Sequence, residues 1–475
     1  MLNKKFIISG CLPIVVATII TYFGYFINTY HLDTSIQIAS NGMNSMYMSQ
    51  GRYVVVLLNK ILYGNYSLYD NQIVPFITIF ILILCGSYLY FLLSNYSDVS
   101  SYIVKLCISI FFINNPIIYS QLFFKLQAVQ VVLALLILLI TQHILLSNMR
   151  CSFKIILNIL LLIISLLTYQ TFAFVYISFV FFWSLINSKL PKNFLIISVV
   201  SLSITGILTL TIIQFVSWHY NLTTATSSEL YNGWSNLFSG QMTGIYKIKC
   251  IVFSILYIIS LLSGILLRYK KIINKNTFFL LLLIISLFSF TIVFLDWAAP
   301  ARVYFASFSI VFSGILFYIY KINNKTLILI IAFTLTNVLL TINTINIINY
   351  SGFNDIKIAQ NINNEITEVS SGENISDYKI MLIGNTKSGL NKYESLLARV
   401  ATGNTTASDF SITVSPNFWA ISHLLILNSK IGTTYNYTND DIQREILSLN
   451  LHEIYPSKES IKLDKLNKII VVRLS

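Results

Sequence analysis

Runs of about 20 uncharged, apolar residues recur along the chain as far as about residue 345, and they decide what it can fold into. A helix of that length crosses the hydrocarbon core of a bilayer, where the backbone must be hydrogen-bonded internally. The composition agrees, because 56% of the residues are hydrophobic and only 10% are charged, whereas soluble domains carry roughly 25% charged residues. The sequence therefore predicts a polytopic α-helical membrane protein.

We expect about eleven transmembrane helices in this part of the chain. The expected spans are 6–27, 72–93, 101–114, 126–147, 154–168, 171–187, 194–217, 249–267, 277–295, 303–320 and 326–345. The short loops that would share one side with the N-terminus carry the basic residues Lys4, Lys5, Arg150, Lys154, Lys189, Lys192, Arg268, Lys270, Lys271, Lys275, Lys321 and Lys325. Cytoplasmic loops are enriched in such residues, so we expect a cytoplasmic N-terminus. An odd number of spans then places residues 346–475 on the outer side.

Three classes of function are disfavoured. The formal net charge is +13, but the basic residues collect in loops as membrane topology requires, so we expect no nucleic-acid partner. The five cysteines form no CxxC pair, and no His or acidic cluster has metal-ligand spacing, so we expect no metal and no cofactor. Charged residues are nearly absent inside the spans, which disfavours an ion-coupled transporter.

The C-terminal part of the chain carries more charge and lacks long apolar runs. Tyr378–Gly384 favours a strand that enters a turn, and Ile469–Leu474 favours a closing strand. Apolar periodicity predicts helices over 393–400 and 418–427. We therefore expect a transmembrane bundle over 1–345 and a small soluble α/β domain over 346–475.

In this topology the informative polar residues fall on the outer side. The first outer loop contains Asp33, close to the first helix, and Arg52, which precedes a short apolar run expected to lie along the membrane interface. Arginine binds phosphate through paired hydrogen bonds, and a carboxylate can take the proton of an attacking hydroxyl. The set suits transfer of a sugar from a lipid phosphate, with Asp33 as the catalytic base. The expected substrate-binding residues are Arg52, Gln50, Tyr169, Gln170, Asp296, Arg302 and Glu229.

Each of these residues also has a structural explanation. A loop acid such as Asp33 is most often simply solvated. Arg52 and Arg302 could anchor the chain to lipid phosphates, and Tyr169 could belong to the aromatic belt of a membrane protein. The gathering of an acid, two arginines and several aromatic residues on one face nevertheless favours a site.

Several of these pieces occur in an order that resembles a known family. They are Asp33, QGRY at 50–53, TYQTF at 168–172, Pro300 and Arg302 in APAR, and IYPSKESIK at 454–462. Together they resemble the Gtr-type serotype-converting glucosyltransferases of bacterial O-antigen modification, which share the GT-C architecture. That family often carries paired acids in its first outer loop, whereas Thr34 follows Asp33 here. The identity of the base therefore stays open.

The resemblance implies a multi-pass protein of the bacterial inner membrane with a periplasmic C-terminal domain. It implies transfer of glucose from undecaprenyl-phosphate glucose to a sugar of the lipopolysaccharide O-antigen, with inversion at the transferred carbon. A separate flippase and a separate donor-synthesising glucosyltransferase would supply the lipid-linked donor, and no cofactor is implied. Two alternatives remain: an O-antigen polymerase or flippase-type protein, and a non-enzymatic anchor that displays the C-terminal domain.

Overall fold

The structure, a computed structural model, divides into two compact units. The first unit comprises Met1–Phe26, Asn44–Asn343 and Ala401–Asn404, and the second comprises Ile27–Met43, Thr344–Val400 and Thr405–Ser475. The residues that the structure describes are 10–26, 47–63, 73–123, 125–187, 190–191, 193–220, 307–370, 373–375, 377–383, 433–434 and 445–474. The expected spans 249–267 and 277–295 and the expected helices 393–400 and 418–427 lie outside these residues.

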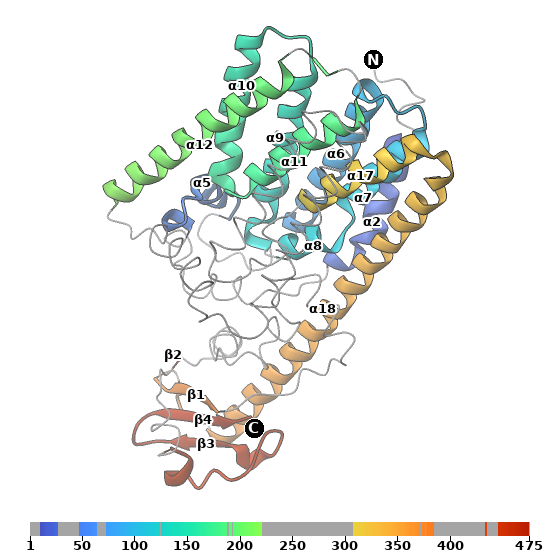
Figure 1. The fold of residues 1–475 in the computed structure, drawn as a ribbon. Coiled ribbons are helices and arrows are strands. Elements are labelled where there is room, and N and C mark those ends of the chain that lie inside the picture. Colours follow the sequence, from blue (N-terminus) through green and yellow to red (C-terminus); the bar gives the residue numbers. More distant parts are fainter. Residues whose placement is uncertain are drawn as a thin grey trace, which may run out of the picture. The chain divides into compact units, whose positions relative to one another are not determined.

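The described part of the first unit is helical (Figure 1). Its elements are α2 (Leu12–Thr21), η2 (Phe23–Phe26), α5 (Tyr53–Tyr63), α6 (Ile73–Tyr96), α7 (Tyr102–Ile113), α8 (Pro116–Leu122), α9 (Lys125–Leu146), α10 (Cys151–Thr168), α11 (Phe172–Ile186), α12 (Phe194–His219), α17 (Ser307–Ile322), η3 (Asn324–Thr326) and the start of α18 (Leu327–Val369). α9 packs against α5, α6, α8, α10 and α11, and α10 also packs against α12. The polar side chains of α9 are therefore placed to meet several other helices.

Among the described residues, six helical stretches are long and apolar enough to cross a membrane. They are Ile73–Tyr96, Tyr102–Tyr119, Gln127–Leu146, Cys151–Thr168, Phe194–His219 and Leu327–Tyr350. α2 and α11 are shorter, at 10 and 15 residues. These helices support a polytopic membrane protein, and the total of about eleven spans stays a prediction.

α12 has polar side chains buried and large apolar side chains exposed. Its buried side includes Ser201, Thr205 and Thr209, while large apolar side chains such as Ile207 and Leu210 are 66% and 62% exposed. A helix on the surface of a water-soluble protein would have the opposite arrangement. Small and hydroxyl-bearing residues between helices, with apolar residues outside, are typical of helices packed in a bilayer.

Three local features of the helices differ from expectation. The helix expected over 154–168 begins at Cys151, so Lys154 lies in its first turn and not in the preceding loop. α8 was not predicted; Asn115 begins it, since the Asn115 Oδ1 accepts a hydrogen bond from the Ile118 amide at 3.0 Å. At the other end of the chain α18 continues unbroken to Val369, so the boundary expected at 345/346 falls inside a helix.

The second unit contains a four-stranded sheet in the order β2-β1-β4-β3. Its strands are β1 (Lys379–Ile383), β2 (Thr433–Thr434), β3 (Ile461–Asp464) and β4 (Ile469–Arg473). β1 runs parallel to β2 and β4, and β3 is antiparallel to β4. The strands expected at 378–384 and 469–474 are thus confirmed as β1 and β4, while β3 was not predicted.

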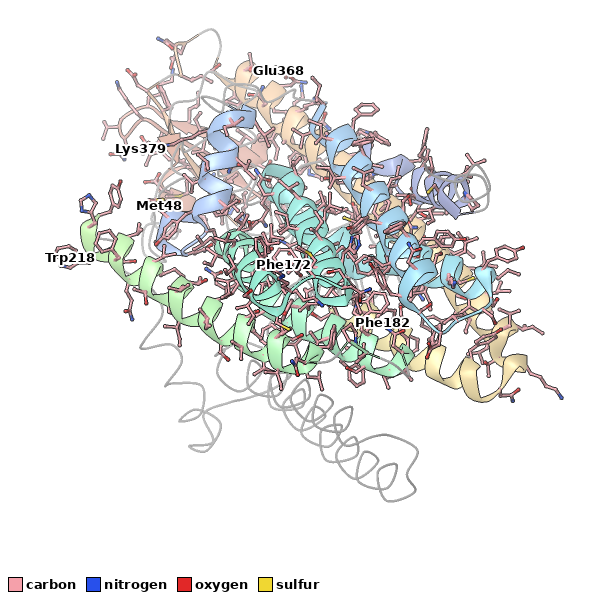
Figure 2. The ribbon with its side chains drawn as sticks, turned by 90° about the horizontal axis from the view of Figure 1, so that it is seen from above. Met48, Phe172, Phe182, Trp218, Glu368 and Lys379 are labelled. Carbon is pink, nitrogen blue, oxygen red and sulfur yellow. The ribbon has the colours of Figure 1, made fainter. Side chains whose placement is uncertain are left out.

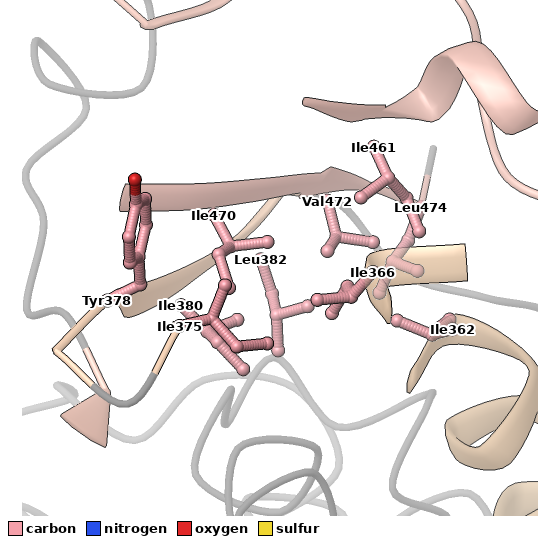
Figure 3. Close-up of a cluster of buried hydrophobic side chains, with 10 residues drawn as sticks. All are labelled: Ile362, Ile366, Ile375, Tyr378, Ile380, Leu382, Ile461, Ile470, Val472 and Leu474. Atoms are coloured by element: carbon pink, nitrogen blue, oxygen red, sulfur yellow. The ribbon is translucent and has the colours of Figure 1, made fainter. Parts of the chain in front are cut away.

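Both faces of this sheet are covered, as expected for strands with near-continuous apolar sequences. Alternate residues of the central strands point to opposite sides. Ile380 and Val472 pack with Ile362 and Ile366 of α18 (Figure 3). On the other face Met381, Ile383, Leu451, Ile469 and Val471 form a second cluster. The C-terminal turns of α18 therefore belong to the core of the second unit.

The IYPSKESIK segment lies against the same part of α18 and contains η4 (Lys458–Ser460). Lys458 Nζ lies 2.9 Å from Glu368 Oε2 in an exposed ion pair, and this contact raises the pKa of the Lys458 ammonium. Burial raises the pKa of the neighbouring Glu365 carboxyl. Because exposed ion pairs contribute little to stability, the segment is held mainly by burial of Ile461 in the cluster that includes Ile362 and Ile366.

Candidate functional site

The QGRY segment forms a tight turn that leads into α5. Gly51 has φ +71°, a left-handed conformation that only glycine adopts without strain. A Cβ atom on Gly51 would lie 2.7 Å from Ile213 Cδ1 and 3.1 Å from Gln170 Nε2. The backbone can therefore approach both α12 and the turn before α11 only because residue 51 has no side chain.

Two hydrogen bonds connect this segment to distant parts of the sequence. Gln170 Nε2 donates to the carbonyl oxygen of Gln50 at 2.7 Å. The Tyr53 hydroxyl donates to the carbonyl oxygen of Ile213 at 3.3 Å. The start of α5, the turn 169–171 and the C-terminal part of α12 are thus joined by hydrogen bonds. Figure 2 labels Met48, Phe172 and Trp218, which lie in or next to these three segments in the sequence.

Arg52 lies at the centre of this arrangement. Its Cζ atom is 4.3 Å from the centroid of the Tyr169 ring and 5.9 Å from that of Tyr47. Its Nη1 donates to Gln127 Oε1 at 3.3 Å, a long hydrogen bond. Its Nε is buried and has no hydrogen-bond partner in the described part of the chain. The guanidinium group is therefore held in place by an aromatic ring and one amide, with donor capacity left over.

The charge of Arg52 is not neutralised within the described residues, whose ion pairs all involve other side chains. Gln127 belongs to the first turn of α9, and the N-terminal end of a helix carries a partial positive charge. Both features favour an anion beside Arg52. Phosphate and carboxylate are the anions whose geometry matches a guanidinium group.

Further polar atoms are buried in α5, α8 and α9 and in the turns before α5 and α11. Gln130 Nε2 of α9 donates to Asn59 Oδ1 of α5. Gln50 Oε1, Thr171 Oγ1 and both side-chain atoms of Gln121 have no hydrogen-bond partner among the described residues. Buried polar atoms usually find partners, so this end of the helices can accept hydroxyl or phosphate groups of a ligand.

The structure brings four of the expected site residues together: Gln50, Arg52, Tyr169 and Gln170. The other four, Asp33, Glu229, Asp296 and Arg302, lie outside the described residues. Sequence reasoning missed Gln127, which contacts Arg52, and it missed the pair Asn59 and Gln130. The sequence did carry a signal for these residues, since Gln127 and Gln130 are two side-chain amides, three residues apart, at the start of an apolar run.

Within the described ranges, no three His, Cys, Asp or Glu side chains gather closely enough to hold a metal ion. The chemical groups that are gathered there are a guanidinium, several amides and aromatic rings. This arrangement can bind and orient an anion that carries hydroxyl groups.

Comparison with known proteins agrees with the resemblance expected from the sequence. The family model described as Glucosyl transferase GtrII matches residues 22–359, which include both Arg52 and Tyr169. No curated protein and no solved structure matches the chain. Since the family model covers well over half of the sequence, this chain belongs to the GtrII glucosyl transferase family.

Proposed function

We propose that this chain transfers glucose from undecaprenyl-phosphate glucose to a sugar of the lipopolysaccharide O-antigen, on the periplasmic side of the bacterial inner membrane. Membership of the GtrII family supports glucosyl transfer, and the long apolar helices support a membrane location. A lipid-linked donor is the form of activated sugar that such a protein can take from the bilayer. A flippase and a donor-synthesising enzyme would deliver it.

The observation that carries the proposal is that Arg52 is held in place by its neighbours while one of its hydrogen-bond donors has no partner in the described part of the chain. Its guanidinium group is held against Tyr169 and directed by Gln127, while its Nε lacks a partner. A phosphate on the donor would supply the acceptor oxygens that this group lacks. Arg302, in the APAR segment that forms part of the family resemblance, is proposed as a second phosphate contact.

In the proposed reaction the oxygen of an acceptor hydroxyl attacks the anomeric carbon of glucose. The bond between that carbon and the phosphate oxygen breaks, and undecaprenyl phosphate leaves as an anion. Arg52 stabilises the negative charge that develops on the leaving group. Asp33 is proposed to take the proton of the acceptor hydroxyl, with Glu229 and Asp296 as reserve candidates on the same face. Gln50, Tyr169 and Gln170 position the donor.

The test measures glucose transfer by the purified protein in lipid nanodiscs, with polyprenyl-phosphate glucose as donor and an O-antigen oligosaccharide as acceptor. Arg52→Ala should lower kcat/KM by about 10²- to 10³-fold. Arg52→Lys should recover only part of the loss, because lysine keeps the charge but loses the planar fork. Lys60→Ala, on the exposed side of α5, is the matched control and should behave as wild type.

Two outcomes would count against the proposal. Wild-type transfer by Arg52→Ala at equal protein concentration would remove Arg52 from the site. Absence of transfer by the wild-type protein from any polyprenyl-phosphate sugar would reject the donor class itself. In cells, NMR analysis of surface polysaccharide with and without the gene would identify the acceptor sugar and the linkage.

A further inference from the structure

α5 is a short helix, and its place in the first unit decides where Arg52 lies. It has 11 residues, fewer than the roughly 12–15 that an isolated helix needs even to be marginally stable in water. One side exposes Leu57 and Ile61, and the other buries Val55 and Val56 where the helix packs against α9 and α10. Contacts with α9 and α10 therefore help to hold α5 in place.

One of these contacts is polar and fully buried. Gln130 Nε2 donates to Asn59 Oδ1, and the two residues are 1% and 0% exposed. Among the described side chains of α5, Asn59 alone is both polar and fully buried. The pair joins the helix that follows Arg52 to the helix that carries Gln127.

The spacing relates this pair to Arg52. Arg52 directly precedes α5, and its carbonyl oxygen accepts a hydrogen bond from the Val56 amide at 3.3 Å. Asn59 follows about two helical turns later, which places it near the same side of the helix as Arg52. Gln127 and Gln130 lie one turn apart on α9 and therefore also share a side. The contact Arg52–Gln127 joins the residue before α5 to α9, and the contact Asn59–Gln130 joins α5 itself to α9.

The pair contributes little to stability. Asn59 Nδ2 and Gln130 Oε1 are buried without hydrogen-bond partners in the described part of the chain. The free-energy cost of burying these two atoms offsets the gain from the one hydrogen bond between the side chains. Apolar side chains such as valine would hold α5 with similar strength. They would not select one register, however, because they pack similarly when a helix shifts along its neighbour, whereas a buried polar pair meets in one register only.

We propose that Asn59 and Gln130 are positioning residues that fix the register of α5 on α9 and so hold Arg52 against Tyr169. The functional part of this proposal rests on the proposed role of Arg52 in binding the donor phosphate. Neither Asn59 nor Gln130 contacts the substrate in this proposal, and both act through the position of α5.

The register can be measured without any assay of activity. Spin labels would be placed at Lys60 on α5 and at Met149, beyond the end of α9, in a cysteine-free background. Replacing both amides, in Asn59→Leu with Gln130→Leu, should shift or broaden the distance distribution between the labels. The control is Gln142→Leu, which removes a buried glutamine from the same helix away from α5 and should leave the distribution unchanged.

Activity provides the second readout. The double leucine variant should keep its melting temperature but lose about 10- to 100-fold in kcat/KM, since small displacements of a positioned group have effects of this size. The reciprocal exchange Asn59→Gln with Gln130→Asn restores two amides and should recover most of the activity.

A wild-type distance distribution or a wild-type kcat/KM in the double leucine variant would overturn the proposal. A loss of activity that the control variant shares, or that accompanies a lower melting temperature, would overturn it as well. If the wild-type protein transferred no sugar at all, the proposed function would fail, while the label distances would still decide the register.

Discussion

Two cationic side chains lie at opposite ends of α9, and their surroundings differ. Lys154 is 4% exposed, and its Nζ donates to the carbonyl oxygens of Leu145 and Ser147 at 2.9 and 2.5 Å, where α9 ends. Arg52 lies at the beginning of α9, where it makes one long hydrogen bond to Gln127 and keeps its Nε unpaired.

The difference follows from the direction of the helix. The C-terminal end of a helix has free carbonyl groups and a partial negative charge, so Lys154 meets a matching partner there. The N-terminal end has a partial positive charge and offers Arg52 nothing of opposite sign. A buried cation is therefore no evidence of function by itself. A cation with an unmet donor, at the end of a helix that favours anions, has the chemistry to bind an anion.

Among the residues that surround Arg52 and Lys154, the largest effect is expected at Gly51, which allows the backbone before Arg52 to approach Ile213 and Gln170. Gly51→Ala places a side chain in a left-handed conformation, at a cost of about 1–2 kcal/mol, and forces its Cβ against Ile213. We expect transfer activity to fall by about 10- to 100-fold, because Arg52 is displaced. Gly206→Ala is the control, since no atom lies within 4 Å of a Cβ at that glycine. Equal activity of the two variants would show that Arg52 does not depend on this turn.

The next effect concerns stability and is expected at Lys154. Lys154→Met should lower the free energy of unfolding by about 1–3 kcal/mol, since the buried carbonyl group of Leu145 and the half-buried one of Ser147 lose their donor. Thermal unfolding in detergent measures this change, with the exposed Lys325→Met as control. Activity per folded molecule should stay at the wild-type level. A variant that is stable but inactive would reverse the comparison and give Lys154 a functional role.

The smallest effect is expected at Tyr169, whose ring supports Arg52. Tyr169→Phe keeps an aromatic face and should leave the KM for the lipid donor nearly unchanged. Tyr169→Leu removes the cation–π contact and should raise that KM by about 3- to 10-fold. If the phenylalanine and leucine variants had the same KM for the lipid donor, the aromatic ring would not be what holds Arg52. A raised KM in both variants would assign that role to the Tyr169 hydroxyl group.

Sequence patterns predicted the helices well and the contacts between them less well. Long apolar runs specify α6, α9, α10 and α12, because their length and composition leave no other structure in a bilayer. α8 was missed since it is only 7 residues long. β3 was missed because Ile461–Asp464 is only 4 residues long, too short for its alternation of apolar and polar residues to stand out.

The candidate site shows the same limit. Placing Gln50, Arg52, Tyr169 and Gln170 on one side of the membrane followed from loop charges, and the structure brings these four together. Gln127 was overlooked because it was counted as part of an apolar span. Which residue of one helix meets which residue of another depends on rotation and tilt, and neither is encoded in hydropathy.

Gly51 also has a consequence for how related sequences can diverge. Two separate constraints act there: the left-handed backbone, and the space taken by Ile213 and Gln170. A smaller residue at position 213 would relieve the second constraint but leave the first in force. Positions 170 and 213 can therefore change together over evolutionary time, whereas position 51 should remain glycine whatever they become.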